Sequence, residues 1–398
     1  MGVPLMQVDA VDFYYCAMPE VLDIGDGSQD LLLVRVEADG YVGWGECEAS
    51  PLTSIASFVA PMSHSACKPV RDSVLGQRID DIDDIRRIGD LVRANSLDLL
   101  QADHTLSGID MALWDLLGKR LQAPVWQLLG HQRVYPKRPY ASQLFSDTPA
   151  ETLALARQTA ADGYTAAKFG WGPFGRGTAE EDAEHVRAAR EGLGPDLTLL
   201  IDVGTVWVDD VERAGAIVDV LRECDVTWLE EPFVSGAFEA YRRLAELAAP
   251  VAMAAGEGSH DAWQARHMID DAGIGYVQID AGRIGGITPA TDVARYARER
   301  GVTYVNHTFT SHLALSASLQ PFAGHEEAEI CEYPVAPKPL ALAVTTRHLE
   351  RDGEGMVHVP EAPGLGMEVD TEALRDYLVD IEITVNGEVL YRTPDLQA

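Results

Sequence analysis

Short apolar runs recur through the second half of the chain, and each run ends in a charged or ionisable side chain. Runs such as TLLI and YVQI are continuous rather than alternating, which is typical of strands buried on both faces of a parallel sheet. The side chains that end them are Lys168, Asp202, Glu230, Glu257, Asp280, His307 and Glu332, at successive steps of 34, 28, 27, 23, 27 and 25 residues. Each step has room for one strand, one helix and two loops, so the pattern predicts a repeated βα unit.

Helix-forming stretches separate these runs, for example at residues 149–163 and 236–249. Repeated right-handed βαβ crossovers either close into a barrel or form an open sheet. In an open sheet the functional residues gather at one topological switch point, whereas here they end almost every strand. We therefore predict a modified (β/α)8-type barrel, whose strand ends meet at one mouth where active sites lie.

The chain before about residue 125 follows a different pattern. Residues 31–48 contain two strand-like runs joined by a turn at Asp39-Gly40, which predicts an antiparallel hairpin. The Pro-, Ser- and Ala-rich residues 49–66 indicate a loop, and residues 79–95 and 108–121 indicate helices. These elements together predict an α+β domain.

The C-terminal tail also departs from the βα pattern. Residues 380–391 predict a second hairpin with Asn386-Gly387 at its turn, and we expect it to return to the first domain. The predicted division is an α+β domain over residues 1–125, a barrel domain over 135–365, and a C-terminal segment over 366–398.

Length and composition agree with a two-domain globular protein. The chain has 398 residues, of which 46% are hydrophobic, and its mean hydropathy is -0.06. No apolar run is long enough to span a membrane and the start lacks a basic and apolar leader, so we expect a cytoplasmic protein. The five cysteines are scattered without CxxC spacing, which favours free thiols over disulfides or a zinc site.

The net charge of -32 restricts the possible partners. With 63 acidic against 31 basic residues, the chain would repel nucleic acid and anionic membrane surfaces. A small anionic substrate stays compatible with this charge, because a bound divalent metal inverts the sign of the local field.

Three of the run-ending carboxylates, those of Asp202, Glu230 and Glu257, follow one another along the chain. Three carboxylates at one barrel mouth repel one another unless a cation neutralises them. Hard oxygen ligands of this kind suit Mg²⁺, which keeps its remaining positions for water and substrate oxygens. The alternative is that each carboxylate forms a salt bridge, but three in register favour a magnesium site.

His307 ends a later run, and Asp280 ends the run before it. A carboxylate that accepts a hydrogen bond from one imidazole nitrogen fixes the tautomer and raises the basicity of the other nitrogen. The pair therefore predicts a general base. His312 is a competing candidate, although we expect it to lie inside the following helix or loop.

The ordered set of motifs around these residues resembles the enolase superfamily, and within it the mandelate racemase subgroup. The first-domain segment SGIDMALWDLLGK also matches that family, and the resemblance covers essentially the whole chain. The matching motifs in the barrel are ID (201–202), LEEP (229–232), GE (256–257), IDAGRIGG (279–286), NH (306–307) and CEY (331–333).

This resemblance implies an α+β capping domain on a modified β/α barrel, and a chemistry in which Mg²⁺ stabilises an enediolate. The enediolate forms when the proton alpha to a carboxylate is removed. Carried onto this chain, the metal ligands are Asp202, Glu230 and Glu257, and the base is His307 paired with Asp280. The resemblance further implies that Lys168 neutralises the substrate carboxylate and that Glu332 hydrogen-bonds one of its oxygens.

Two positions depart from the subgroup. Relatives usually carry a second lysine at alternate positions of the Lys168 strand, where this chain has Gly170, and many carry asparagine where it has Gly204. Glycine neither donates nor accepts a side-chain proton, so racemisation with two bases is poorly supported. With one base, His307 would take the alpha proton and return it to a beta-hydroxyl that leaves, which is a syn dehydration.

We therefore expect a Mg²⁺-dependent sugar-acid dehydratase, a hydro-lyase that gives a 2-keto-3-deoxy acid. An epimerase of a sugar acid, or a cycloisomerase of its lactone, would use the same enediolate and is the first alternative. A non-catalytic metal-binding homologue is an alternative of another class, against which the retention of His307 and Asp280 argues. We also expect a homo-oligomer.

Some neighbouring residues are candidates for shaping the pocket. The glycine-rich residues 170–177 lack the GK[ST] of a phosphate-binding loop, so we expect a loop over the site in which Trp171 and Phe174 line the pocket. Arg283 is predicted either to contact the metal carboxylates or to lie on the surface.

Tyr14, Tyr15 and residues 49–60 resemble the capping segments that set specificity in relatives. The resemblance implies that these parts of the first domain could take part in substrate specificity.

Overall fold

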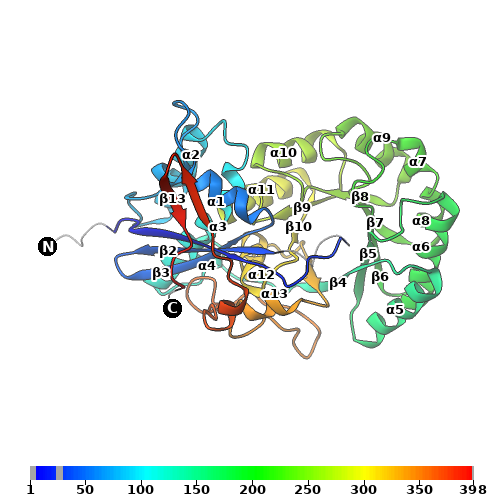
Figure 1. The fold of residues 1–398 in the computed structure, drawn as a ribbon. Helices are drawn as coiled ribbons and strands as arrows, with labels where there is room; N and C mark the ends of the chain where they lie inside the picture. Colours follow the sequence, from blue (N-terminus) through cyan, green and yellow to red (C-terminus); the bar gives the residue numbers. More distant parts are fainter. Residues whose placement is uncertain (1–5, 24–29, 397–398) are drawn as a thin grey trace.

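The computed structural model describes residues 6–23 and 30–396, and it contains an antiparallel domain that lies beside a β/α barrel (Figure 1). The antiparallel sheet has the order β1 (Ala10–Cys16), β2 (Leu31–Ala38) and β3 (Tyr41–Cys47). Asp39 and Gly40 join β2 to β3 with φ of 49° and 78°. These positive φ angles are those of a tight hairpin turn, so the predicted turn is confirmed.

Helices cover this sheet, and one of them corrects the sequence prediction. Residues 49–66 were expected to form a loop, but α1 (Pro51–Val59) begins there with proline in its first turn. The helix forms because Ile55, Phe58 and Val59 bury an apolar face against the core of the domain. The other two long helices, α2 (Ile82–Asn95) and α3 (Ala102–Leu121), agree with the prediction.

The barrel is a sheet of eight parallel strands in the order β10-β9-β8-β7-β6-β5-β4-β11. This arrangement, together with the antiparallel domain, confirms the predicted fold class. The strands are β4 (Arg138–Leu144), β5 (Ala166–Gly170), β6 (Thr198–Asp202), β7 (Val226–Glu230), β8 (Ala252–Ala255), β9 (Tyr276–Asp280), β10 (Thr303–His307) and β11 (Ile330–Pro334).

Helices connect consecutive strands and form the outer layer of the barrel (Figure 1). They are α5 (Pro149–Ala161), α6 (Ala179–Leu193), α7 (Val211–Gly215), α8 (Val218–Glu223), α9 (Phe238–Ala248), α10 (Ala262–Asp271), α11 (Ile287–Arg300) and α12 (His312–Leu319). Shorter helices lie at α4 (Val125–Leu128) and α13 (Pro339–Ala343). None of the helices among residues 6–23 and 30–396 combines the length and hydrophobicity needed to cross a membrane.

The side chain of Asn306 joins the first and last strands of this sheet order. Its Oδ1 accepts the backbone N–H of Glu332 at 2.9 Å, and its Nδ2 donates to the Glu332 carbonyl at 3.4 Å. Asn306 lies in β10 and Glu332 in β11, so an amide side chain links the two strands at the seam of the barrel.

The barrel interior has an apolar layer beneath a polar one. The apolar layer is a separate buried cluster made of Tyr140, Ala166, Leu200, Trp228, Ala254, Val305 and Ile330. Side chains two positions apart on a strand share a face, so the next inward positions lie one layer closer to the mouth. Those positions hold Ser142, Lys168, Asp202, Glu230, Gly256, His307 and Glu332.

The C-terminal hairpin lies against the N-terminal sheet (Figure 1). Its strands are β12 (Glu382–Val385) and β13 (Glu388–Arg392), and Asn386 and Gly387 form the predicted turn. The Tyr391 hydroxyl donates to the Phe13 carbonyl in β1 at 2.5 Å.

The five cysteines are free thiols, as predicted. Four of them are buried, and Cys67 is half-buried.

Candidate active site at the barrel mouth

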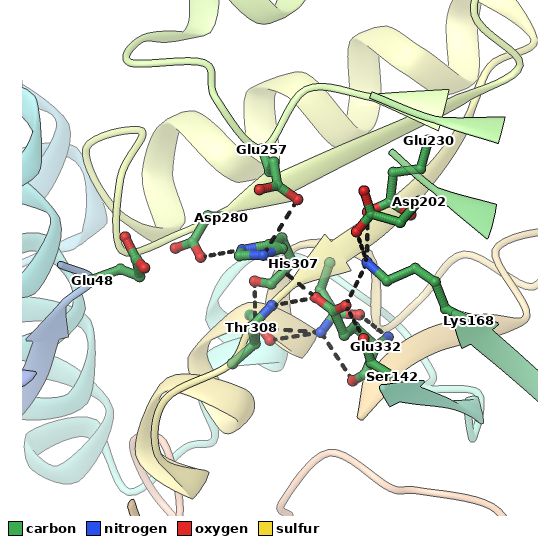
Figure 2. A network of polar contacts seen from close by, with 12 residues as sticks. Glu48, Ser142, Lys168, Asp202, Glu230, Glu257, Asp280, His307, Thr308 and Glu332 are labelled. Atoms are coloured by element: carbon green, nitrogen blue, oxygen red, sulfur yellow. Dashed lines mark hydrogen bonds and ion pairs between the residues drawn. The ribbon is translucent and has the colours of Figure 1, made fainter. Parts of the chain in front are cut away.

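Lys168 is the cation around which three carboxylates converge at the ends of the strands (Figure 2). Its Nζ lies 2.5 Å from Glu230 Oε1, 2.9 Å from Glu332 Oε1 and 3.4 Å from Asp202 Oδ2. These residues come from β5, β6, β7 and β11, and all four are buried. The structure thus brings together four of the seven side chains that the sequence analysis singled out.

Burial dominates the electrostatics of this group. Removal from water raises the pKa of Asp202 and holds the pKa of Glu230 well above its ordinary value, although Lys168 opposes both shifts. Burial alone would lower the pKa of Lys168, but the surrounding carboxylates outweigh it and raise that pKa. Lys168 therefore stays protonated. The ionised forms of the carboxylates around it are stabilised by its positive charge.

Glu332 is held by hydrogen bonds to both of its carboxylate oxygens. Ser142 Oγ donates to Oε1 at 2.9 Å, and the backbone N–H of Thr308 donates to Oε2 at 2.8 Å. Sequence reasoning missed Ser142, because β4 does not end in a charged residue. The available signal was the repeat of period two, which places Ser142 one inward position beyond Tyr140, as Lys168 stands beyond Ala166.

His307 and Asp280 form the pair that the sequence predicts. His307 Nδ1 lies 2.7 Å from Asp280 Oδ2, and the backbone N–H of Gly282 donates to Asp280 Oδ1 at 2.6 Å. The other ring nitrogen, Nε2, lies 3.3 Å from Glu257 Oε2. The geometry of a histidine oriented by a carboxylate is therefore present, and its role as a base stays a prediction.

Arg283 links the capping domain to Glu257. Its guanidinium binds both oxygens of Glu48, at 2.6 and 3.0 Å, and its NH1 lies 3.5 Å from Glu257 Oε1. Burial opposes the charge of Arg283, but Glu48 more than compensates and raises its pKa. Of the two predictions for Arg283, contact with a candidate metal carboxylate is the one that agrees with this geometry.

Sequence reasoning missed Glu48, which follows β3 of the capping domain. Only the tertiary contact between that strand and the end of β9 brings it to the barrel mouth, where its backbone N–H donates to the Gly282 carbonyl at 3.2 Å. The charged run GECE at the end of a predicted strand was the one signal available.

The candidate metal ligands fit a hard cation in chemical type. Asp202 and Glu230 are buried carboxylates with raised pKa values, and Glu257 adds a third carboxylate at the same mouth. Within residues 6–23 and 30–396, however, no three His, Cys, Asp or Glu side chains are grouped so as to hold a metal ion. Asp202 and Glu230 turn toward Lys168 whereas Glu257 turns toward His307 (Figure 2). The assignment of these three residues to magnesium stays a prediction.

A cavity of about 20 Å³ lies among these side chains. Its walls include Lys168, Asp202, Glu257 and His307, together with the aromatic side chains of Trp171 and Phe309. Trp171 thus lies where the sequence predicts. It also explains Gly204, because a β-carbon at that residue would lie 2.7 Å from the Trp171 indole.

Phe174 corrects a prediction. It is 1% exposed and stacks on Phe145 with ring centroids 4.7 Å apart, so it belongs to the core and not to the cavity wall. The expectation failed because loop sequences do not reveal which aromatic side chain turns inward.

Tyr14 and Tyr15 also do not line this cavity. Tyr14 is fully buried, with its hydroxyl donating to the Asp395 carbonyl at 3.2 Å, and the Tyr15 hydroxyl donates to Asp30 at 2.5 Å. Both tyrosines therefore hold the capping domain together.

His312 is excluded as the base by its position. It begins α12, its ring stacks on His348 at 4.6 Å, and its Nδ1 accepts the Leu349 backbone N–H at 3.1 Å. Burial lowers the pKa of His312 to about 4, so it stays neutral and structural.

Comparison with known sequences matches both parts of the chain to described domain families. Residues 17–130 match the mandelate racemase / muconate lactonizing enzyme N-terminal domain, and residues 151–373 match the enolase C-terminal domain-like family. A crystal structure of a predicted mandelate racemase from Rhodobacter sphaeroides is 59% identical, with a TM-score of 0.94, and the match covers 98% of this chain and 100% of that one.

Curated relatives include enzymes of two reaction types. D-galactarolactone cycloisomerase from Agrobacterium fabrum is 30% identical over 364 residues, covering 87% of this chain and 90% of the relative. D-galactonate dehydratase from Klebsiella pneumoniae is 28% identical over 357 residues, covering 86% of this chain and 89% of the relative. Both similarities extend over the capping domain and the barrel together.

Proposed function

Since the chain belongs to the mandelate racemase / muconate lactonizing enzyme family of the enolase superfamily, we propose that it removes the proton alpha to the carboxylate of a sugar acid. A beta-hydroxyl is then lost, and the product is a 2-keto-3-deoxy acid. The observation that carries this proposal is the His307 imidazole, held by Asp280 at 2.7 Å and facing a cavity lined by Lys168 and Asp202.

His307 acts as the base. Donation from Nδ1 to Asp280 assigns the proton to that nitrogen and leaves the lone pair of Nε2 for the substrate. Asp280 then stabilises the imidazolium that forms when the alpha proton is transferred. Because Glu257 lies 3.3 Å from Nε2, the alpha carbon must displace that carboxylate to reach the base.

The electrons of the broken C–H bond move onto the substrate carboxylate, which therefore gains negative charge. The Lys168 ammonium balances part of this charge, and Glu332 is the residue that, by the family resemblance, hydrogen-bonds a substrate carboxylate oxygen. A Mg²⁺ ion, which Asp202, Glu230 and Glu257 would hold when it is bound, supplies further neutralising charge. Loss of one preorganised contact of this kind typically costs about 3–4 kcal/mol of transition-state stabilisation.

The second step uses the same imidazole. The imidazolium gives its proton to the beta-hydroxyl, the C–O bond breaks, and water leaves as the enol forms and then tautomerises to the keto acid. One base suffices for this sequence. Gly170 carries no side chain that could serve as a second base on the opposite face.

Cycloisomerisation of a sugar-acid lactone is the second candidate, and the 30% identity to D-galactarolactone cycloisomerase favours it. It would use the same proton abstraction, but the ring oxygen would leave in place of a free hydroxyl. The small size of the cavity does not distinguish the two. At about 20 Å³ it has room for water rather than a sugar acid, so either substrate must displace some of the side chains that line it.

The proposal is tested by incubating the purified protein with Mg²⁺ and a panel of aldonic acids, aldaric acids and their lactones in D₂O. We expect a 2-keto acid to accumulate from at least one free acid. Product formation from a lactone alone would favour cycloisomerisation. Absence of both product formation and deuterium incorporation at the alpha carbon across the panel would contradict the proposed chemistry.

A further inference from the structure

Glu46 is a buried carboxylate on the capping domain whose hydrogen bonds are incomplete. It lies in β3, is 1% exposed, and one of its oxygens, Oε2, accepts the hydroxyl of Ser311 at the start of α12. Its other oxygen, Oε1, is buried and has no hydrogen-bond partner among the described residues. An unpaired polar atom in the interior is costly, so native structures usually supply a partner, often an ordered water.

A second cavity lies against this carboxylate. Its volume is about 10 Å³, which is the space that one water molecule needs. The lining side chains include the carboxylates of Glu46, Glu48 and Asp280, and the hydroxyl-bearing residues Thr308 and Thr310. A site with this many polar groups satisfies the two to four hydrogen bonds that a buried water makes.

Asp280 also lines this cavity. Its Oδ2 lies 2.7 Å from His307 Nδ1, and its Oδ1 accepts the Gly282 N–H at 2.6 Å. A carboxylate oxygen accepts more than one hydrogen bond, so Asp280 retains capacity toward the cavity.

We propose that one buried water bridges Glu46 Oε1 to Asp280, which makes Glu46 a positioning residue for the His307 base. The water donates one hydrogen bond to each carboxylate and so fixes the orientation of Asp280 relative to the imidazole. This inference rests on the proposed function for its catalytic consequence, whereas the bridging water itself does not depend on that function.

The charge of Glu46 gives the bridge a second effect. Burial raises the pKa of Glu46 to about 7, against the opposing hydrogen bonds from the side chains of Ser311 and Thr310. The ionisable groups that face it are Asp280 and Glu48 across the cavity and the thiols of Cys16 and Cys47 within its own domain. Ionised Glu46 adds negative charge behind Asp280 and favours the imidazolium, so proton abstraction becomes faster as pH rises through about 7.

Two substitutions separate the bridge from the charge. Glu46→Leu removes every polar atom from this wall, whereas Glu46→Gln keeps the hydrogen bond to the water and removes the ionisation. Glu37→Gln is the matched control, because Glu37 lies in the adjacent strand β2 and pairs with Arg35 at 2.8 Å, away from both cavities. Thermal unfolding of each variant shows whether it is folded.

The first measurement is a high-resolution crystal structure of the substrate-free protein and of each variant. We expect ordered water between residues 46 and 280 in the wild type and in Glu46→Gln, and none in Glu46→Leu. A wild-type cavity without water, or a water that does not reach Asp280, overturns the inference whatever reaction the protein catalyses.

The second measurement is the rate of alpha-deuterium exchange against pH with a substrate identified in the screen above. Outer groups of this kind typically contribute about 10–100-fold, so Glu46→Leu should lower the exchange rate by roughly that factor while KM changes little. Glu46→Gln should keep the exchange rate that the wild type has below pH 7 and should lack the rise in rate near pH 7. An unchanged profile in both variants overturns the catalytic part. If no substrate of the wild type is found, the proposed function fails, and the crystal structures still decide the bridge.

Discussion

Gly170 lies so close to Asp202 that a β-carbon at residue 170 would be 2.6 Å from the Asp202 β-carbon. The two residues face each other across β5 and β6, where they are register partners. The glycine is therefore required by the position of a candidate ligand, and a second lysine cannot stand there without displacing it.

We expect Gly170→Ala to move Asp202 and to lower kcat by about 100-fold, since displacement of a catalytic group by about 1 Å has effects of that size. Steady-state kinetics and a crystal structure of the variant test this. Gly215→Ala is the control, because a β-carbon at Gly215 meets no atom within 4 Å. Full activity of Gly170→Ala, with Asp202 in place, would show that the close approach is unimportant.

His307→Asn should abolish both product formation and alpha-proton exchange, because it removes the nitrogen that accepts the proton. The amide keeps much of the shape of the ring, so the fold should be retained. His64→Asn, at a histidine that is 53% exposed, is the control and should leave both rates unchanged. Exchange that persists in His307→Asn would assign the base to another residue, with Lys168 the nearest candidate.

Replacement of Asp202, Glu230 or Glu257 by alanine should weaken Mg²⁺ binding by at least about 10-fold, which corresponds to about 1.4 kcal/mol. Isothermal titration calorimetry measures this without any substrate. Glu239→Gln on α9, where the side chain is 66% exposed, should bind Mg²⁺ as the wild type does. A wild-type affinity in all three alanine variants would contradict the metal assignment.

Ser142→Ala should lower kcat, with only a small loss in the free energy of unfolding. The change removes a 2.9 Å hydrogen bond to Glu332 and costs about 1 kcal/mol in the free energy of unfolding. Glu332 then keeps the Thr308 N–H and the Lys168 ammonium as donors but loses one of the groups that orient it, so kcat should fall by roughly 10-fold. Thermal unfolding and kinetics on the same preparation separate the two effects, and an unchanged kcat would remove Ser142 from the active site.

Without added metal, the protein should lose stability as pH rises from about 6.5 to 8, above the range in which its buried histidines have the opposite effect. Burial raises the pKa of Glu46 to about 7 and that of Glu231 to about 8. These groups bind more protons folded than unfolded above their ordinary pKa values, so the free energy of unfolding falls as pH passes through the raised values. Thermal unfolding against pH measures this, and Glu231→Gln should flatten the upper part of the curve.

The sequence pattern was sufficient for seven of the eight barrel strands, because each is a short apolar run followed by a charged or ionisable residue. It missed β4, where the corresponding inward position holds Ser142, since a serine two residues after Tyr140 does not stand out in the sequence. It also predicted a loop at residues 49–66, because Pro, Ser and Ala are common both in loops and in the first turns of helices.

The contribution of the capping domain could not be predicted in the same way. Glu46 and Glu48 reach the barrel only because β3 packs against the end of β9. The hydrophobic periodicity of the sequence does not predict which strand end contacts which loop. The orientation of the carboxylates is likewise a tertiary property. Glu257 contacts His307 and Arg283, and sequence spacing alone groups it with Asp202 and Glu230.

Asn306 precedes His307 in the chain, and its amide holds the backbone of Glu332 on the neighbouring strand. The backbone of Glu332 is thus tied to β10 at the residue that directly precedes the candidate base. Loss of the Asn306 amide would remove this link between the two strands that carry His307 and Glu332, whose side chains lie 3.9 Å apart between Nε2 and Oε2.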